Sequence, residues 1–85
     1  MRIQILYFAQ LRERFGQSGE SLDLPADVLT VADLIAHLAA RGGVWQEELA
    51  KGAALRIALN QEMVTENTAL TDGAEVAVFR PVTGG

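Results

Sequence analysis

Apolar and polar residues alternate over the first stretch of the chain, "RIQILYF". Ile3, Ile5 and Tyr7 fall on one side of an extended backbone, and Leu6 and Phe8 fall on the other. A period of two residues is typical of a strand with one face buried. We therefore predict an amino-terminal strand with its isoleucines and tyrosine facing the core.

Two shorter segments follow this strand. "AQLRERFG" places Leu11 and Phe15 four residues apart and ends at Gly16, which indicates one or two helical turns stopped by glycine. "ESLDLP" alternates again, with Leu22 and Leu24 pointing inward, and its proline ends the run because proline cannot donate to a ladder. This second run predicts a second strand.

The clearest helical pattern is "TVADLIAHLAARGG". Thr30 can cap the amino end, and Asp33 stands three residues later, where an acid favours the positive end of a helix. We expect Gly42 to stop the helix. One stripe at helical spacing comprises Val31, Leu34, Ile35 and Leu38.

The segment after this helix predicts a short helical turn and a strand pair. "VWQEELAKG" can hold the turn, and "ALRIALNQEMV" reads as a strand with Leu55, Ile57 and Leu59 inward. A bend near Asn60 and Gln61 then allows a short return.

The final periodic stretch is "LTDGAEVAVFRPV". Asp72-Gly73 is a strong turn signal, after which Val76 and Val78 point one way and Phe79 points the other. We predict the last strand here.

The order of these elements predicts an α+β fold. One mixed sheet of four to five strands has the main helix packed across one face, and the last strand lies parallel beside the first. This is the β-grasp arrangement of ubiquitin. We expect a single domain over residues 1–85, with residues 81–85 as an extended carboxyl-terminal tail.

Composition narrows the possible functions. The 85 residues are 49% hydrophobic and 21% charged, which is ordinary for one globular domain, and there is no cysteine to form a disulfide or a thiolate site. The net charge of −4 argues against nucleic-acid binding. Charges interrupt the apolar amino terminus early, so we expect a cytoplasmic protein that uses no membrane.

The usual catalytic side chains form no convincing constellation. We expect His37 to be solvated, and the adjacent acids Glu47 and Glu48 to serve solvation and capping. Trp45 covers an edge of the core or belongs to a partner surface. The sequence thus predicts no self-sufficient active site and no bound cofactor or metal.

The carboxyl-terminal "RPVTGG" offers a different chemistry. An ionised α-carboxylate is a poor electrophile, but an acyl-adenylate at Gly85 would be open to nucleophilic attack. Gly84 and Gly85 carry no Cβ to widen the chain, and residues 82–85 span roughly 13 Å when extended. Val82 and Thr83 can add edge hydrogen bonds inside a partner. The alternative is a frayed end without function.

Several stretches together resemble the small, sulfur-carrying subunit of molybdopterin synthase. They are "ILYFAQLRE", "TVADLIAHL", "ALNQEMV" and "LTDGAEVAVFRPVTGG", which cover nearly the whole chain in order. The resemblance implies that a ubiquitin-activating-like adenylyltransferase uses ATP to adenylate Gly85, and that a sulfur donor protein then supplies a thiocarboxylate. The tail would enter the large subunit of a heterotetramer and give sulfur to cyclic pyranopterin monophosphate.

The same resemblance implies which residues meet the partner. It places apolar contacts at Phe8, Met63 and Phe79, and the strand pattern separately turns both phenylalanines away from the helix-covered face. The family commonly has two prolines after the aromatic residue, whereas this chain has Arg80 before Pro81. Arg80 pairs with an acid of the large subunit or stays solvated.

Two other functions stay open at this point. The first is a sulfur carrier for thiamine biosynthesis or tRNA thiolation, which would share the diglycine end. The second is a passive ubiquitin-like binding module. Extending the chain past Gly85 would inactivate a carrier and leave a passive module functional.

Overall fold

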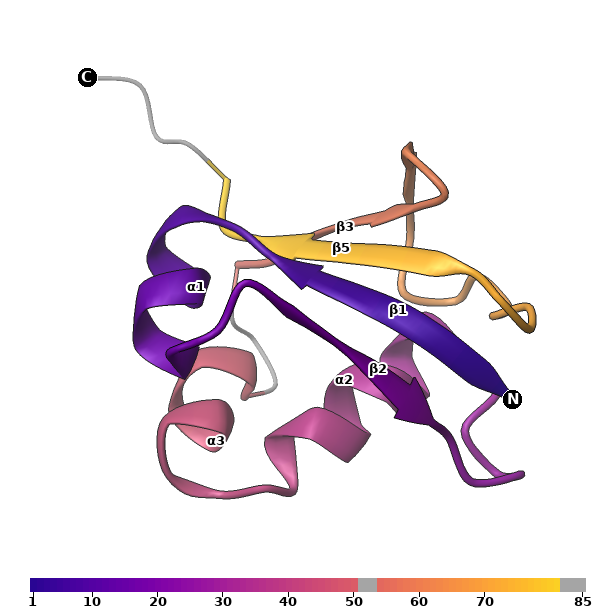
Figure 1. Cartoon of the computed structure of the whole chain (residues 1–85), viewed down its shortest axis with the longest axis horizontal. Helices are drawn as coiled ribbons and strands as arrows, with labels where there is room; N and C mark the ends of the chain where they lie inside the picture. The colour runs from indigo at the N-terminus through magenta and orange to yellow at the C-terminus, as the bar shows by residue number, and fades with distance from the viewer. Residues whose placement is uncertain (51–53, 82–85) are drawn as a thin grey trace.

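The structure is a computed structural model that describes residues 1–50 and 54–81 (Figure 1). Within these residues no helix has the length and apolar character needed to cross a membrane. The elements are β1 (Arg2–Tyr7), α1 (Ala9–Phe15), β2 (Gly19–Asp23), α2 (Val31–Ala39), α3 (Gly43–Leu49), β3 (Arg56–Leu59), β4 (Glu62–Val64) and β5 (Glu75–Phe79).

The strands form one mixed sheet in the order β2-β1-β5-β3-β4. β1 is antiparallel to β2 and parallel to β5, and β3 is antiparallel to both β5 and β4. The last strand therefore lies at the centre of the sheet, between the first strand and the β3–β4 hairpin. This confirms the predicted β-grasp arrangement, including the parallel pairing of the first and last strands.

The core lies between this sheet and the helices that cover one of its faces (Figure 1). Each predicted inward set contributes to it. The fully buried large side chains are Ile3, Ile5, Tyr7, Leu11, Val31, Leu34, Leu38, Val76 and Val78. Burying side chains of this size is the main favourable term in folding. The period-two and helical patterns of the sequence therefore predicted the core side chains correctly.

Glycines at two helix boundaries behave differently. Gly16 adopts the left-handed conformation at φ 69° and ends α1, as predicted. Gly42 does not end α2, which is a correction: α2 stops at Ala39 with Ala40 as its cap. Gly42, at φ 78°, begins α3 instead, and its carbonyl accepts the amide of Trp45 at 3.1 Å. Glycine suits both kinds of boundary, so composition alone did not distinguish them.

The two predicted turns also need special backbone conformations. Asn60 and Gln61 both have positive φ, at 49° and 72°, which is the signature of the tight hairpin between β3 and β4. Gly73 has φ 81° in the turn before β5. The turn signals in the sequence are confirmed at both places.

The amino end of α2 forms the predicted capping box. The Thr30 side chain accepts the amide of Asp33, and the Asp33 carboxylate accepts the amides of Leu29 and Thr30 at 3.0 and 3.1 Å. The Leu29 and Thr30 amides hold the pKa of Asp33 below its ordinary value of 3.8. A carboxylate with a depressed pKa stabilises the fold above its unfolded pKa, and this contribution is lost as the pH falls through its folded pKa.

We expect Thr30→Ala to destabilise the domain by about 1 kcal/mol, because the Asp33 amide loses its partner. Urea unfolding at neutral pH measures this change. Thr68→Ala is the control, because Thr68 is also a half-buried threonine but its side chain does not cap α2. An unchanged unfolding midpoint for Thr30→Ala would show that the box adds no stability.

Candidate functional site

The predicted site residues divide between the described structure and the tail. Val82, Thr83, Gly84 and Gly85 lie outside the described residues. Pro81 is the last described position and is half-buried. The structure therefore bears on the partner contacts expected on the sheet and on the base of the tail.

One row of small and apolar residues crosses four strands on the face away from the helices. The strand registers pair Leu6 with Ala77, Ala77 with Ala58, and Ala58 with Met63. Directly paired residues on neighbouring strands point to the same side of a sheet. These four positions therefore form one continuous band across β1, β5, β3 and β4.

Two aromatic residues extend this band where β1 and β5 end. The rings of Phe8 and Phe79 meet edge to face, with centroids 6.3 Å apart. Phe8 is 45% exposed and Met63 is 59% exposed, which is high for large apolar side chains. We call this surface the outer apolar face; its members are Leu6, Phe8, Ala58, Met63, Ala77 and Phe79.

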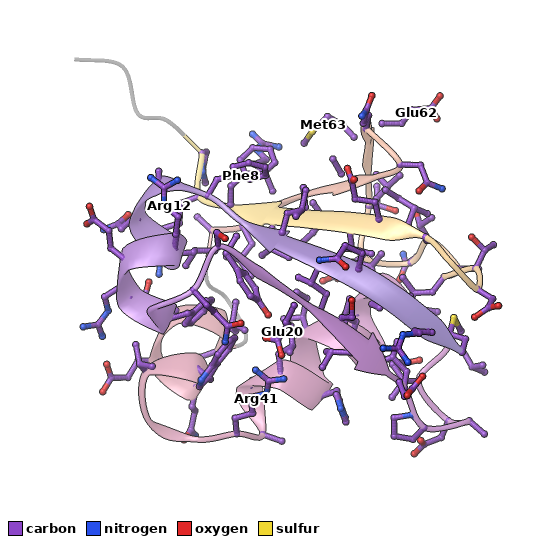
Figure 2. The ribbon with its side chains drawn as sticks, viewed as in Figure 1. Phe8, Arg12, Glu20, Arg41, Glu62 and Met63 are labelled. Atoms are coloured by element: carbon purple, nitrogen blue, oxygen red, sulfur yellow. The ribbon has the colours of Figure 1, made fainter. Side chains whose placement is uncertain are left out.

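The orientation predicted for Phe8 and Phe79 is thus confirmed, since both lie on the face opposite the helices. Figure 2 shows Phe8 and Met63 standing on the side of the sheet away from α2 and α3. A contiguous apolar surface on a small protein is a common mark of a protein-binding site. That these residues contact a partner stays a prediction.

Opposite charges flank the outer apolar face at its two ends (Figure 2). Arg12 lies one helical turn after Phe8, and its amide bonds to the Phe8 carbonyl. Glu62 precedes Met63 in β4. Charged residues at the edge of an apolar surface favour one orientation of a charged partner and one register of docking.

The base of the tail is tied to the helices through charged groups. Arg80 Nε and Nη2 donate to one oxygen of Glu48, at 3.0 and 2.7 Å. The other Glu48 oxygen accepts from Arg14 Nε at 3.1 Å, and Arg14 Nη2 also donates to Glu47 at 2.7 Å. We call Arg14, Glu48 and Arg80 the tail-base network.

The tail-base network corrects two expectations. Arg80 was expected either to meet an acid of a partner or to stay solvated, but it pairs with Glu48 of its own domain. Glu48 was expected to be a solvated acid, but its side chain is only 13% exposed. Hydrogen bonding from Arg80, with a smaller contribution from Arg14, lowers the pKa of Glu48.

A second polar cluster lies on the helix-covered side and closes an edge of the core. Glu20 accepts the Tyr7 hydroxyl at 2.8 Å and two Arg41 nitrogens, each at 2.8 Å. Burial, followed by the hydrogen bond to Glu20, raises the pKa of Tyr7, and hydrogen bonding from Arg41 lowers that of Glu20. The residues of this cluster have no recognisable spacing along the chain, so the sequence pattern does not predict it.

Trp45 belongs to this edge of the core. It stacks on Phe15 with ring centroids 3.9 Å apart, and the Arg41 guanidinium lies 4.4 Å from its ring centroid. The reading of Trp45 as a cover for the core edge is confirmed. His37 is half-buried in α2, and no cluster of three metal-binding side chains occurs among residues 1–50 and 54–81.

Comparison with known proteins gives a consistent result. Residues 5–85 match the model of the ThiS family. Over 83 residues, the chain is 45% identical to a molybdopterin synthase sulfur carrier subunit of Escherichia coli K12, covering 98% of this chain and 99% of the relative.

Solved structures show the same fold. A candidate molybdopterin converting factor, subunit 1, of Pyrococcus furiosus superposes with a TM-score of 0.79 at 32% identity, covering 96% of this chain and 99% of the other. A chain from the complex of subunits 1 and 2 of the Helicobacter pylori 26695 molybdopterin-converting factor gives a TM-score of 0.67 at 23% identity, with full coverage of both chains.

Proposed function

This chain belongs to the ThiS family, and we propose that it is the sulfur carrier subunit of molybdopterin synthase. The observation that carries the proposal is the identity of 45%, over nearly the full length, to a carrier of that name. The outer apolar face supports it, because a carrier must dock on another protein in order to deliver its sulfur.

The chemistry would take place on the Gly85 carboxylate. A carboxylate oxygen attacks the α-phosphorus of ATP in the site of a ubiquitin-activating-like adenylyltransferase, and pyrophosphate leaves. Sulfur supplied at the sulfide level by a donor protein then attacks the acyl carbon, AMP leaves, and the thiocarboxylate forms. In this scheme ATP belongs to the activating enzyme, and the carrier itself binds no cofactor.

The thiocarboxylate is a better nucleophile than the carboxylate that it replaces. Inside the large subunit its sulfur would attack a carbon of cyclic pyranopterin monophosphate and displace an oxygen substituent, and water would hydrolyse the resulting thioester to return the Gly85 carboxylate. Two such transfers would build the dithiolene of molybdopterin. The narrow glycines Gly84 and Gly85 suit passage through a confined channel. Val82 and Thr83 would line its entrance.

We assign the outer apolar face to the large subunit. Phe8, Met63 and Phe79 would be its apolar anchors, while Arg80 and Pro81 would sit where the tail leaves the interface. The complex of two subunits solved for the Helicobacter pylori protein supports a second subunit as the partner class. Aromatic anchors in the centre of an interface commonly dominate its binding energy.

Intact mass spectrometry tests the sulfur-carrying role directly. The purified chain is incubated with the activating enzyme, ATP and a sulfur donor, and samples lacking ATP are the control. We expect a mass gain equal to the exchange of one oxygen for sulfur, located at Gly85 by fragmentation. A chain that keeps an ordinary carboxylate under these conditions would contradict the proposal.

The two alternative functions predict different results when the same proteins are assayed. A carrier for thiamine biosynthesis or tRNA thiolation would acquire the same sulfur, but it would not release it to cyclic pyranopterin monophosphate with the large subunit present. A passive ubiquitin-like module would not be thiolated at all. No observation in residues 1–50 and 54–81 favours either alternative.

A further inference from the structure

The tail-base network fixes the first residue after the sheet from two directions. Arg80 follows Phe79, the last residue of β5, so its backbone starts from the central strand of the sheet. Its guanidinium is held by Glu48 in α3, on the helix-covered side. The start of the tail is therefore restrained both by the strand and by a side chain that reaches back to a helix.

Glu48 is itself held firmly enough to act as an anchor. It precedes Leu49, which is buried at the end of α3. Its second oxygen is occupied by Arg14 of α1, so two helices fix the carboxylate. The side chains of Arg80 and Glu48 are 28% and 13% exposed, which limits the competition from water and salt that weakens fully exposed pairs.

We propose that Glu48 is a positioning residue that acts through Arg80 to fix the direction in which the tail leaves the domain. This inference rests on the proposed function, because it matters only if the tail must enter another protein. Restraining the base of the tail in the free carrier removes part of the ordering cost that binding would otherwise impose. The effect would appear in the recognition of the tail and not in the chemistry at its end.

A competing role for Arg80 makes the opposite prediction. If Arg80 bound an acid of the partner directly, Glu48 would compete with that acid for the guanidinium. Removing the Glu48 charge would then free Arg80 and strengthen recognition. Whether loss of the Glu48 charge weakens or strengthens binding of the tail by the partner therefore distinguishes a positioning role from a direct contact.

The test compares Glu48→Gln with Glu47→Gln. Both variants remove one negative charge from the same turn, but Glu47 contacts Arg14 and makes no described bond to Arg80. For each folded variant, adenylation by the activating enzyme gives KM and kcat, and ¹⁵N relaxation reports the mobility of the Arg80 Nε–H group.

We expect Glu48→Gln to raise KM roughly two- to fivefold with kcat unchanged, as for the loss of one partly exposed ion pair. The Arg80 Nε–H group should become more mobile. Glu47→Gln should leave KM within experimental error and the mobility unchanged. Melting temperatures of both variants verify that the assays are run on folded protein.

A second variant tests whether restraint of the backbone at position 80 is enough to lower KM. Arg80→Pro, placed in the Glu48→Gln background, fixes φ at this position and also restricts Phe79 before it. We expect it to return KM toward the wild-type value although the ion pair is absent. A direct contact between Arg80 and the partner could not be rescued in this way.

Three results would overturn the positioning role: an unchanged KM in Glu48→Gln, a lowered KM in that variant, or no rescue by proline. A wild-type chain that the activating enzyme does not adenylate would instead contradict the proposed function. The two failures are thus distinguished within one set of measurements.

Discussion

Deletion of Gly85 abolishes sulfur delivery while leaving the melting temperature of the domain unchanged; this is the largest effect that we expect. The reacting carboxylate would move to Gly84 and fall about one residue short, roughly 3.3 Å, of the sites that act on it. Misplacement of a reacting group by such a distance costs orders of magnitude in rate. The described core runs from Ile3 to Val78, so folding should not depend on the deleted residue.

Single-turnover sulfur transfer and thermal melting on the same sample measure both halves of this prediction. A variant with one alanine added after Gly85 is the matched control for length, and it should also be inactive and fully stable. Binding of each variant to the large subunit should persist through the outer apolar face. Transfer at the wild-type rate, or a melting temperature lowered by several degrees, would show that the end of the chain has another role.

The second large effect concerns Phe8, the most exposed aromatic residue of the outer apolar face. We expect Phe8→Ala to weaken the complex with the large subunit by roughly 1–3 kcal/mol, about 5- to 150-fold in Kd, as for a desolvated aromatic anchor. Because Phe8 is 45% exposed in the free domain, its truncation should cost little stability. Isothermal titration calorimetry measures the change in affinity.

Leu29→Ala is the control for this experiment. Leu29 is 57% exposed, so it also presents a large apolar side chain to solvent, but it lies before α2 and not on the outer apolar face. We expect its truncation to leave the affinity unchanged. Equal losses from the two substitutions would mean that binding follows general hydrophobicity, and an unaffected Phe8→Ala complex would place the interface elsewhere.

Periodicity predicted the fold because each element buries one regular face. The alternation of Ile3, Ile5 and Tyr7 identifies a strand, and the spacing from Val31 to Leu38 identifies a helix, without knowledge of any distant contact. The same alternation placed Phe8 on the outer face. The orientation of the candidate docking surface was therefore available from the sequence.

The charged contacts could not be predicted in this way. Glu48 and Arg80 are separated by 32 residues, and Glu20 and Arg41 by 21. Whether such charged groups meet depends on how the helices and strands pack, and no repeat or spacing in the sequence predicts that packing. Glu48 consequently looked like an ordinary surface acid, although it anchors the base of the tail.

The prediction that Gly42 ends α2 was wrong for a more local reason. A glycine with positive φ can follow one helix or precede another, and "ARGGVW" contains both boundaries within a few residues. The boundary of an element is less strongly specified than its existence, because only a few terminal hydrogen bonds decide it.

The central position of β5 in the sheet determines when the sheet can fold during synthesis. Without it, β1 and β3 have no common neighbour, and the sheet separates into the β1–β2 and β3–β4 hairpins. Isolated two-stranded hairpins are at best marginally stable in water. The five-stranded sheet therefore cannot assemble until β5, the last of its strands in sequence, has been translated. A partner that binds the outer apolar face, which includes Ala77 and Phe79 of β5, can dock only once this last strand has joined the sheet.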